Sequence, residues 1–150
     1  AALGLEAWHG IEINTDLREP YQALIAYLTT KSPQTQMSIE FGDASQVDYS
    51  SLDYDTVFAS PPYYFLEKYP HNVAYSSKSE MDERFYRPLF ANSFAHLKQG
   101  GHFVINVCRE VYDNVLKPLL GEADELFPLK KSKRQNQHTE MVYVWRKVVS

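Results

Sequence analysis

The sequence has little of several residue types, and each shortage excludes a class of protein. Its single cysteine, Cys108, cannot form an internal disulfide, which argues against a disulfide-rich secreted scaffold and favours a cytoplasmic protein. No run of about 18 apolar residues is present, so we expect no membrane partner. The 15 basic residues are outnumbered by 19 acidic ones, and the net charge of −4 provides no overall positive field to attract nucleic acid.

Metal-ligand patterns are also absent from the sequence. The histidines are scattered without the spacing that metal sites use, so we expect no metal. What is present is the composition of an ordinary globular domain, with 150 residues of which 44% are hydrophobic and 14% aromatic. A chain of this length buries a sizeable core when it folds.

Short apolar runs alternate with helix-period stretches along the chain, and this alternation is typical of an α/β sheet. We expect strands at 7–13, 38–41, 56–59, 102–108, 125–129 and 141–147. The last two are expected to form a hairpin around a polar loop. Helices are expected over residues 17–30, 80–97 and 113–120, with a loop over 63–78.

Capping patterns set the expected helix starts. Asp16, with Glu19 three residues later, is typical of a helix N-cap and capping box. Ser79 with Asp82 suggests a second cap, and Pro88 is expected to start or kink the helix that follows.

The motif that carries chemical information is Ser60-Pro61-Pro62-Tyr63, directly after the strand expected at 56–59. Two consecutive prolines keep the backbone extended. An aromatic ring after a rigid turn at a strand's carboxyl end lies over the crevice where α/β sheets bind ligands. Such a turn can hold a flat group that carries an amine. The alternative is a rigid surface turn after a buried strand.

This motif resembles that of the S-adenosylmethionine-dependent amino-methyltransferases, which carry Asp/Asn/Ser-Pro-Pro-Tyr/Phe after their fourth strand. The Ser form is most similar to that of N4-cytosine DNA methyltransferases, with N6-adenine enzymes as the alternative. The resemblance implies that Ser60 and the Pro61 carbonyl accept hydrogen bonds from the target amine, and that Tyr63 stacks on the base. It also implies S-adenosylmethionine as the cofactor and a nucleic acid as the partner, DNA preferred over RNA.

Two further strand ends resemble the same family. Glu12 takes the position of the acidic residue that binds the ribose hydroxyls of the cofactor, and Asn14 is a neighbour that could share this role. Asp43, in Gly42-Asp43-Ala44, resembles the adenine-binding turn, in which the backbone of Ala44 would meet a ring nitrogen. The alternatives are an exposed strand-end glutamate and an ordinary Asx turn. Ser60 completes the expected cofactor-binding set.

The resemblance implies a Rossmann-like class I methyltransferase sheet with helices on both faces and a carboxyl-terminal β-hairpin. The family's glycine-rich loop is missing, because none of the six glycines forms a Gly-x-Gly. Since the ribose strand precedes the Pro-Pro motif, that loop and the first strand are expected upstream of Ala1. We therefore expect residues 1–150 to be the carboxyl-terminal portion of a single methyltransferase domain.

Several features leave alternatives open. The aromatic run of Tyr64, Phe65 and Tyr69 lines the base pocket or packs its own loop. A basic run contacts phosphate or is a solvated loop; it consists of Lys130, Lys131, Lys133 and Arg134. Cys108 is expected to be a buried structural thiol.

The sequence is also compatible with other functions. The guanine N2 amine of RNA and a protein glutamine amide are alternative substrates, although relatives that act on them more often carry Asp or Asn where this chain has Ser60. A non-catalytic binding subunit that keeps the fold is the alternative from a different class.

Overall fold

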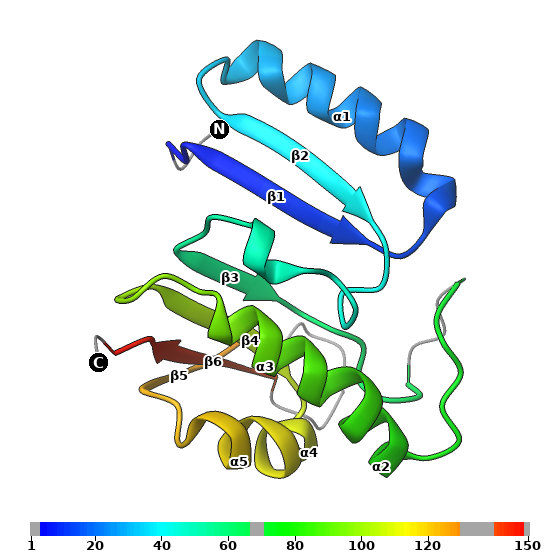
Figure 1. Cartoon of the computed structure of the whole chain (residues 1–150), viewed down its shortest axis with the longest axis vertical. Helices are drawn as coiled ribbons and strands as arrows, with labels where there is room; N and C mark the ends of the chain where they lie inside the picture. Colours follow the sequence, from blue (N-terminus) through cyan, green and yellow to red (C-terminus); the bar gives the residue numbers. More distant parts are fainter. Residues whose placement is uncertain (1–3, 67–70, 130–139, 149–150) are drawn as a thin grey trace. The chain divides into compact units, whose positions relative to one another are not determined.

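The computed structural model describes residues 4–66, 71–129 and 140–148, whose helices and strands are shown in Figure 1. They divide into two compact units. The first unit contains residues 4–47 and 71–73, and the second contains residues 48–66, 74–129 and 140–148. The α/β order expected from the sequence is confirmed, and all six expected strands are present.

The first unit is a β-α-β arrangement. Strands β1 (Ala7–Glu12) and β2 (Gln36–Phe41) pair in parallel, and helix α1 (Arg18–Lys31) connects them. Because the strands are parallel, their carboxyl ends lie at the same edge, where the Gly42 N–H donates to the Glu12 carbonyl at 2.9 Å. The two strand ends that carry the expected cofactor residues are therefore adjacent.

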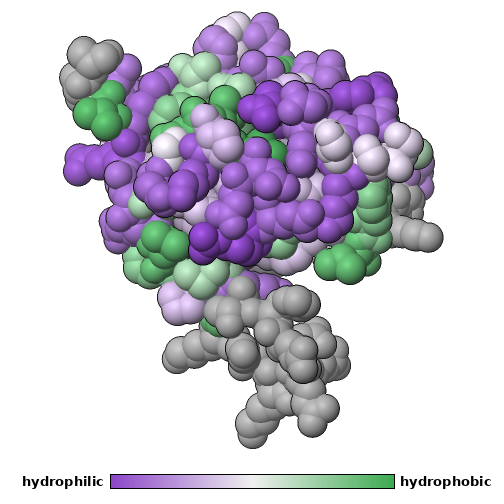
Figure 2. Space-filling model, turned by 90° about the horizontal axis from the view of Figure 1, so that it is seen from below, coloured by the Kyte–Doolittle hydropathy of each residue, from purple (hydrophilic) through white to green (hydrophobic). Residues whose placement is uncertain are grey.

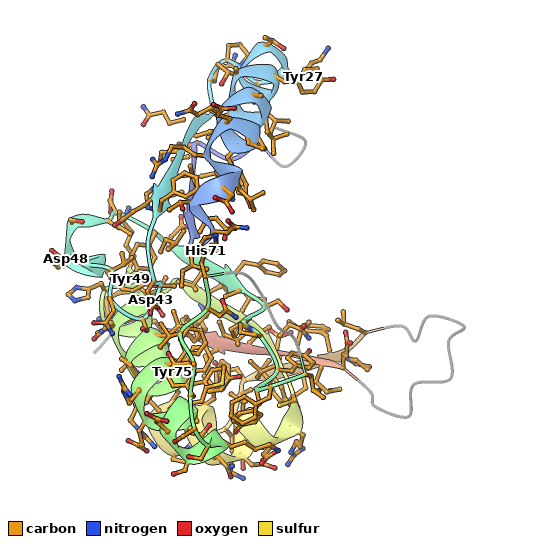
Figure 3. The ribbon with its side chains drawn as sticks, turned by 90° about the vertical axis from the view of Figure 1, so that its right-hand side faces the viewer. Tyr27, Asp43, Asp48, Tyr49, His71 and Tyr75 are labelled. Atoms are coloured by element: carbon orange, nitrogen blue, oxygen red, sulfur yellow. The ribbon has the colours of Figure 1, made fainter. Side chains whose placement is uncertain are left out.

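The start of α1 differs from the expectation. A 3-10 turn, η1 (Thr15–Leu17), precedes the helix, and its N-cap is Asn14, whose side chain accepts from the Asp16 N–H. Asp16 as N-cap is therefore wrong, because the turn begins two residues earlier and Asp16 lies inside it. No residue of α1 is fully buried, and Tyr27 stands on its surface, 60% exposed (Figure 3).

The second unit contains a four-stranded sheet in the order β3-β4-β6-β5. Strand β3 (Thr56–Ala59) is parallel to β4 (His102–Val107), and the remaining pairs, with β6 (Met141–Arg146) and β5 (Glu125–Pro128), are antiparallel. The expected pairing of the last two strands is confirmed, although most of the loop between them, with its basic run, lies outside the described residues. The short 3-10 turn η2 (Tyr49–Ser51) was not expected.

Two helices of the second unit contain π-helical segments. One runs through α2 (Lys78–Met81), η3 (Asp82–Tyr86) and α3 (Arg87–Ala95). The other runs through α4 (Arg109–Val111), η4 (Tyr112–Leu116) and α5 (Lys117–Leu120). Each π-segment ends two residues before a proline, Pro88 or Pro118. Because proline lacks an N–H and its ring clashes with the carbonyl four residues back, a wider turn accommodates it.

The helix starts in this unit also need correction. Ser77, not Ser79, caps α2, because its side chain accepts from the Glu80 N–H. Pro88 lies in the first turn of α3, as the sequence indicates. The helix expected over 113–120 begins at Arg109, four residues earlier.

The core of the second unit lies between its helices and one face of its sheet. Phe103, Ile105 and Val107 alternate along β4 and are all buried. Phe90 of α3 meets Phe103 edge to face, with ring centroids 6.2 Å apart, and Tyr112 of η4 stacks on Tyr143 of β6 at 4.1 Å. Both helices therefore cover the same face of the sheet within this unit.

Within the described strands, both edges of the β1-β2 sheet and the β3 edge of the four-stranded sheet lack a further strand. Among the described residues, β1 pairs only with β2, and β3 only with β4. A further strand at these edges stays a prediction. Figure 2 shows one face of the molecule, on which the described hydrophobic side chains form small separate groups among hydrophilic ones. No described helix is long and apolar enough to cross a membrane.

Candidate functional site

The Ser60-Pro61-Pro62-Tyr63 motif begins where β3 ends. Ala59 is paired with Ile105, so the chain leaves β3 beside Asn106 of the neighbouring parallel strand. The Ser60 hydroxyl donates to Asn106 Oδ1 at 2.9 Å, and the Tyr63 hydroxyl donates to the same oxygen at 2.9 Å. One carboxamide oxygen thus joins the first and last side chains of the motif.

Asn106 is itself held by the next strand. Its Nδ2 donates to the Met141 carbonyl of β6 at 3.0 Å, which fixes the amide orientation through its hydrogen-bond partners. Sequence reasoning did not single out Asn106. The available signal was a polar residue within the apolar run 103–107 of a strand.

A helix holds the motif at its second proline. The Tyr86 hydroxyl donates to the Pro62 carbonyl and accepts from the Tyr64 N–H at 2.9 Å. Tyr86 is fully buried and belongs to the π-helical segment η3. The backbone on both sides of Tyr63 is therefore bonded to one buried side chain.

Tyr64 packs the loop instead of lining an open pocket. Its side chain is 5% exposed, its φ of 47° lies in the left-handed region, and its hydroxyl donates to Asp82 Oδ1 at 2.8 Å. Burial, followed by the hydrogen bond to Asp82, raises the pKa of Tyr64. Phe65 is 47% exposed, and Tyr69 lies outside the described residues.

Glu12 lies at the carboxyl end of β1, in the first unit. Its Oε1 accepts from the Asn14 N–H at 2.8 Å, and its Oε2 accepts from the Tyr21 hydroxyl at 3.3 Å. Burial raises the pKa of Tyr21, and the charge of Glu12 adds to that effect. The carboxylate is therefore fixed in direction. The Asn14 side chain is used to cap η1.

Asp43 lies in the turn after β2 (Figure 3) and forms an Asx turn. Its Oδ1 accepts from both the N–H and the hydroxyl of Ser45, each at 2.8 Å, and Ser45 is 3% exposed. The Asx turn that the sequence offered as the alternative is therefore present, and it uses Oδ1. Neither of these two bonds involves Oδ2, the second carboxylate oxygen. The half-buried Ala44 follows Asp43 directly.

The expected site residues thus form two groups, each within one unit. The first unit holds Glu12, Asp43 and Ala44 at the shared edge of β1 and β2. The second unit holds the motif residues 60–63 at the end of β3, with Ser60 exposed and Pro61 buried. Cys108 is half-buried, less than expected. Within the described ranges, no cluster of His, Cys, Asp or Glu could hold a metal ion.

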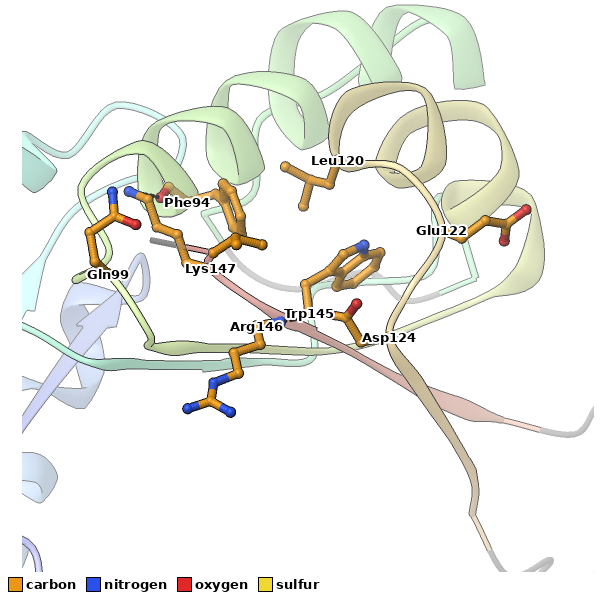
Figure 4. A pocket seen from close by; sticks show the side chains of 9 residues that line it. Phe94, Gln99, Leu120, Glu122, Asp124, Trp145, Arg146 and Lys147 are labelled. Carbon is orange, nitrogen blue, oxygen red and sulfur yellow. Dashed lines mark hydrogen bonds between the residues drawn. The ribbon is translucent and has the colours of Figure 1, made fainter. Parts of the chain in front are cut away.

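A cavity of about 390 Å³ lies elsewhere in the second unit (Figure 4). Its lining includes Phe94, Leu120, Glu122, Asp124, Trp145 and Arg146. Arg146 pairs with His102, the first residue of β4, whereas the motif follows the carboxyl end of the parallel strand β3. The cavity therefore lies near the opposite ends of these strands and is not part of the motif site.

No protein-family model and no curated protein sequence matches the chain. Solved structures do match it. TrmN from Thermus thermophilus is 15% identical with a TM-score of 0.51, and the match covers 93% of this chain but only 36% of TrmN. A SAM-dependent methyltransferase from Methanosarcina mazei is 13% identical with a TM-score of 0.57, over 96% of this chain and 83% of the other.

An rRNA methylase from Streptococcus thermophilus also matches, with 8% identity and a TM-score of 0.51 over 97% of this chain and 89% of the other. At these identities the comparisons establish the fold. The chain has the Rossmann-like α/β fold of class I methyltransferases, as the motif resemblance implied.

Proposed function

We propose that the chain transfers a methyl group from S-adenosylmethionine to an exocyclic amine of a nucleic-acid base. The observation that supports this most is the joint anchoring of Ser60 and Tyr63 on Asn106, at the carboxyl end of a parallel strand pair. Ligands of open α/β sheets bind at such strand ends. The site therefore combines a hydrogen-bond acceptor with an aromatic ring where a base would enter.

The first unit has acceptors that fit the cofactor. A carboxylate has about four lone-pair sites, and among the described residues each Glu12 oxygen accepts one bond, from Asn14 or Tyr21. Glu12 would accept from the two ribose hydroxyls. Asp43 Oδ2 would accept from the adenine amine, and the Ala44 backbone would meet a ring nitrogen. The Methanosarcina neighbour is described as SAM-dependent, which supports this cofactor.

Bound S-adenosylmethionine supplies an electrophilic methyl group. The chain's task is to activate the amine, whose lone pair is conjugated into the base. Hydrogen bonds from the amine to Ser60 Oγ and the Pro61 carbonyl would favour tetrahedral geometry at nitrogen and hold it in line. With the amine held in this way, its lone pair would form the bond to the methyl carbon, the sulfur would keep the C–S electron pair, and the amine proton would pass to water.

Tyr63 is assigned to stacking on the target base, which must leave the helix if the substrate is a duplex. Its ring is half-buried and its hydroxyl is bonded to Asn106, so the ring plane is restrained before a base arrives. Base–aromatic stacking is worth about 1–3 kcal/mol per base. Restraining the ring in advance reduces the entropy lost on binding.

The Ser form of the motif favours DNA, with cytosine N4 or adenine N6 as the methylated atom. A second candidate is an RNA amine, such as guanine N2, and the rRNA methylase among the structural neighbours supports it. A protein glutamine amide and a non-catalytic binding role are outcomes of the experiment that follows.

The experiment measures transfer of labelled methyl from S-adenosylmethionine to DNA, RNA and protein by the full-length chain. Transfer to DNA or RNA is expected. Tyr63→Ala should lower the rate by roughly 5- to 150-fold, the equivalent of the stacking energy. Tyr27→Ala on the surface of α1 is the matched control and should keep full activity. Label in protein alone, or no transfer, would contradict the proposal.

A further inference from the structure

We propose that Asn106 is the positioning residue of this site, and that it makes Ser60 an obligate hydrogen-bond acceptor. This inference rests on the proposed function and adds to it a source of substrate selectivity. Asn106 lies on β4, in register with Val142 of β6, and its side chain meets the motif at the end of β3. It acts through Ser60 and Tyr63 and does not itself contact the substrate.

The inference follows from the single proton of the Ser60 hydroxyl. A serine hydroxyl has one proton and two lone pairs, and when unrestrained it rotates to suit either a donor or an acceptor. Here the proton is given to Asn106 Oδ1 at 2.9 Å. Only lone pairs are then left for a ligand. The Tyr63 hydroxyl donates its proton to the same Asn106 oxygen, so Asn106 fixes the direction of both hydroxyl protons of the motif.

The sheet prevents Asn106 from reversing its amide. A flipped carboxamide would turn Oδ1 toward the Met141 carbonyl, which its Nδ2 now contacts at 3.0 Å, and Nδ2 toward two hydroxyls. The first contact would be repulsive, and the half-buried amide would lose the hydrogen bonds that it now makes. The backbone of β6 therefore determines which way the Ser60 proton points.

Selectivity follows from this arrangement. An exocyclic amine presents N–H donors, and these match the lone pairs of Ser60. An exocyclic carbonyl at the same ring position presents lone pairs of its own and would meet no proton. A site built to pair with a polar group rejects the analogue that cannot pair, because polar groups are left unsatisfied. Asn106 would thus exclude uracil or thymine from a cytosine site.

The first test is a double-mutant cycle on methyl transfer by the full-length chain. Asn106→Ala should lower kcat by about 100-fold through misplacement of Ser60, with the KM for S-adenosylmethionine unchanged. In a background that carries both Ser60→Ala and Tyr63→Phe, adding Asn106→Ala should slow the reaction no further, since Asn106 acts through those two hydroxyls. Asn92→Ala, which changes an exposed asparagine on α3, is the matched control. The proposal would be overturned if Asn106→Ala lowered the rate by the same factor in that background as in the parent chain.

The second test does not depend on activity. In a proton–nitrogen correlation spectrum, the side-chain amide signal of Asn106 should shift in both Ser60→Ala and Tyr63→Phe, and should stay in place in Asn92→Ala. An unmoved signal would overturn the positioning role even in an active enzyme. A chain that transfers no methyl group, yet shows both shifts, would refute the proposed function and leave the anchoring of Ser60 by Asn106 supported.

Discussion

The hydroxyl of Tyr86 donates to the carbonyl of Pro62, so a side chain of the π-helical segment η3 is bonded to the second proline of the motif. The hydroxyl oxygen of Tyr86 also accepts a hydrogen bond from the Tyr64 N–H at 2.9 Å. Together with Asn106 on β4, this contact ties the loop to both a helix and a strand. A site held by such supporting bonds is preorganised for binding.

Tyr86→Phe should lower the free energy of unfolding by about 1–3 kcal/mol, because the N–H of buried Tyr64 and the Pro62 carbonyl both lose their partner. Urea unfolding measures the change. Tyr27→Phe is the matched control, since Tyr27 is 60% exposed, and it should stay within about 0.5 kcal/mol of the parent. Equal stability of Tyr86→Phe and the parent would contradict the account.

The stacked pair Tyr112 and Tyr143 should respond in opposite directions to loss of a hydroxyl. Tyr143 is fully buried, and its hydroxyl has no hydrogen-bond partner among the described residues. Tyr143→Phe removes that unsatisfied group, so thermal unfolding should show a gain of about 1 kcal/mol. The Tyr112 hydroxyl bonds Glu122 at 2.8 Å and the Ala123 N–H at 3.2 Å, so Tyr112→Phe should be destabilising.

The contrast within this pair separates the hydroxyl effect from packing. The rings lie 4.1 Å apart and nearly parallel, and phenylalanine preserves that stacking in both variants. Destabilisation by Tyr143→Phe as large as that by Tyr112→Phe would show that the Tyr143 hydroxyl has a partner.

Glu80 and Asp82, two residues apart on one helix, should give opposite pH dependences. Bonds from the Ser76 hydroxyl and N–H, and then from Arg84, lower the pKa of Glu80 from 4.5 to about 2. Its stabilising contribution is present above pH 4.5 and is lost as the pH falls toward 2. Burial raises the pKa of Asp82 above 3.8, so its carboxylate costs stability as the pH rises through that raised value.

A pH series of urea unfolding tests both signs. Glu80→Gln should flatten the loss of stability between about pH 4.5 and 2. Asp82→Asn keeps an acceptor for the Tyr64 hydroxyl and should remove the decline that begins above about pH 3.8. An unchanged acid slope in Glu80→Gln would contradict the assignment.

Lys147 should stabilise the end of α3. Its Nζ donates to the carbonyls of Phe94 at 3.0 Å, Ala95 at 2.6 Å and Leu97 at 2.7 Å. A cation on the last carbonyls of a helix satisfies them and complements the helix dipole. Lys147→Met should cost about 1–2 kcal/mol in thermal unfolding, and Arg146→Met, beside it on β6, should cost less. Equal losses would refute the capping role.

The strands could be predicted from the sequence because each is a short apolar run bounded by turn-forming residues, as at 56–59 and 102–107. The motif stood out because Pro-Pro after a strand has a fixed backbone. The helix starts were misplaced because several Ser, Asn and Asp residues near them can cap, and the choice between Asn14 and Asp16 depends on local backbone geometry.

The supporting residues could not be predicted because they depend on register. Asn106 meets Ser60 only because Ala59 pairs with Ile105, and no sequence pattern specifies that pairing. Tyr86 reaches Pro62 from 24 residues away, on a π-helical turn that helical periodicity does not describe. Apolar periodicity reveals elements, whereas contacts between distant polar groups follow from how those elements are packed.

The most direct test of the central claim is the position of the transferred methyl group on the base. DNA and RNA methylated by the full-length chain would be digested to nucleosides and analysed by mass spectrometry against standards. We expect a methyl group on an exocyclic nitrogen, as in N4-methylcytosine or N6-methyladenine. A methyl group on a ring carbon, a ring nitrogen or the ribose would contradict it.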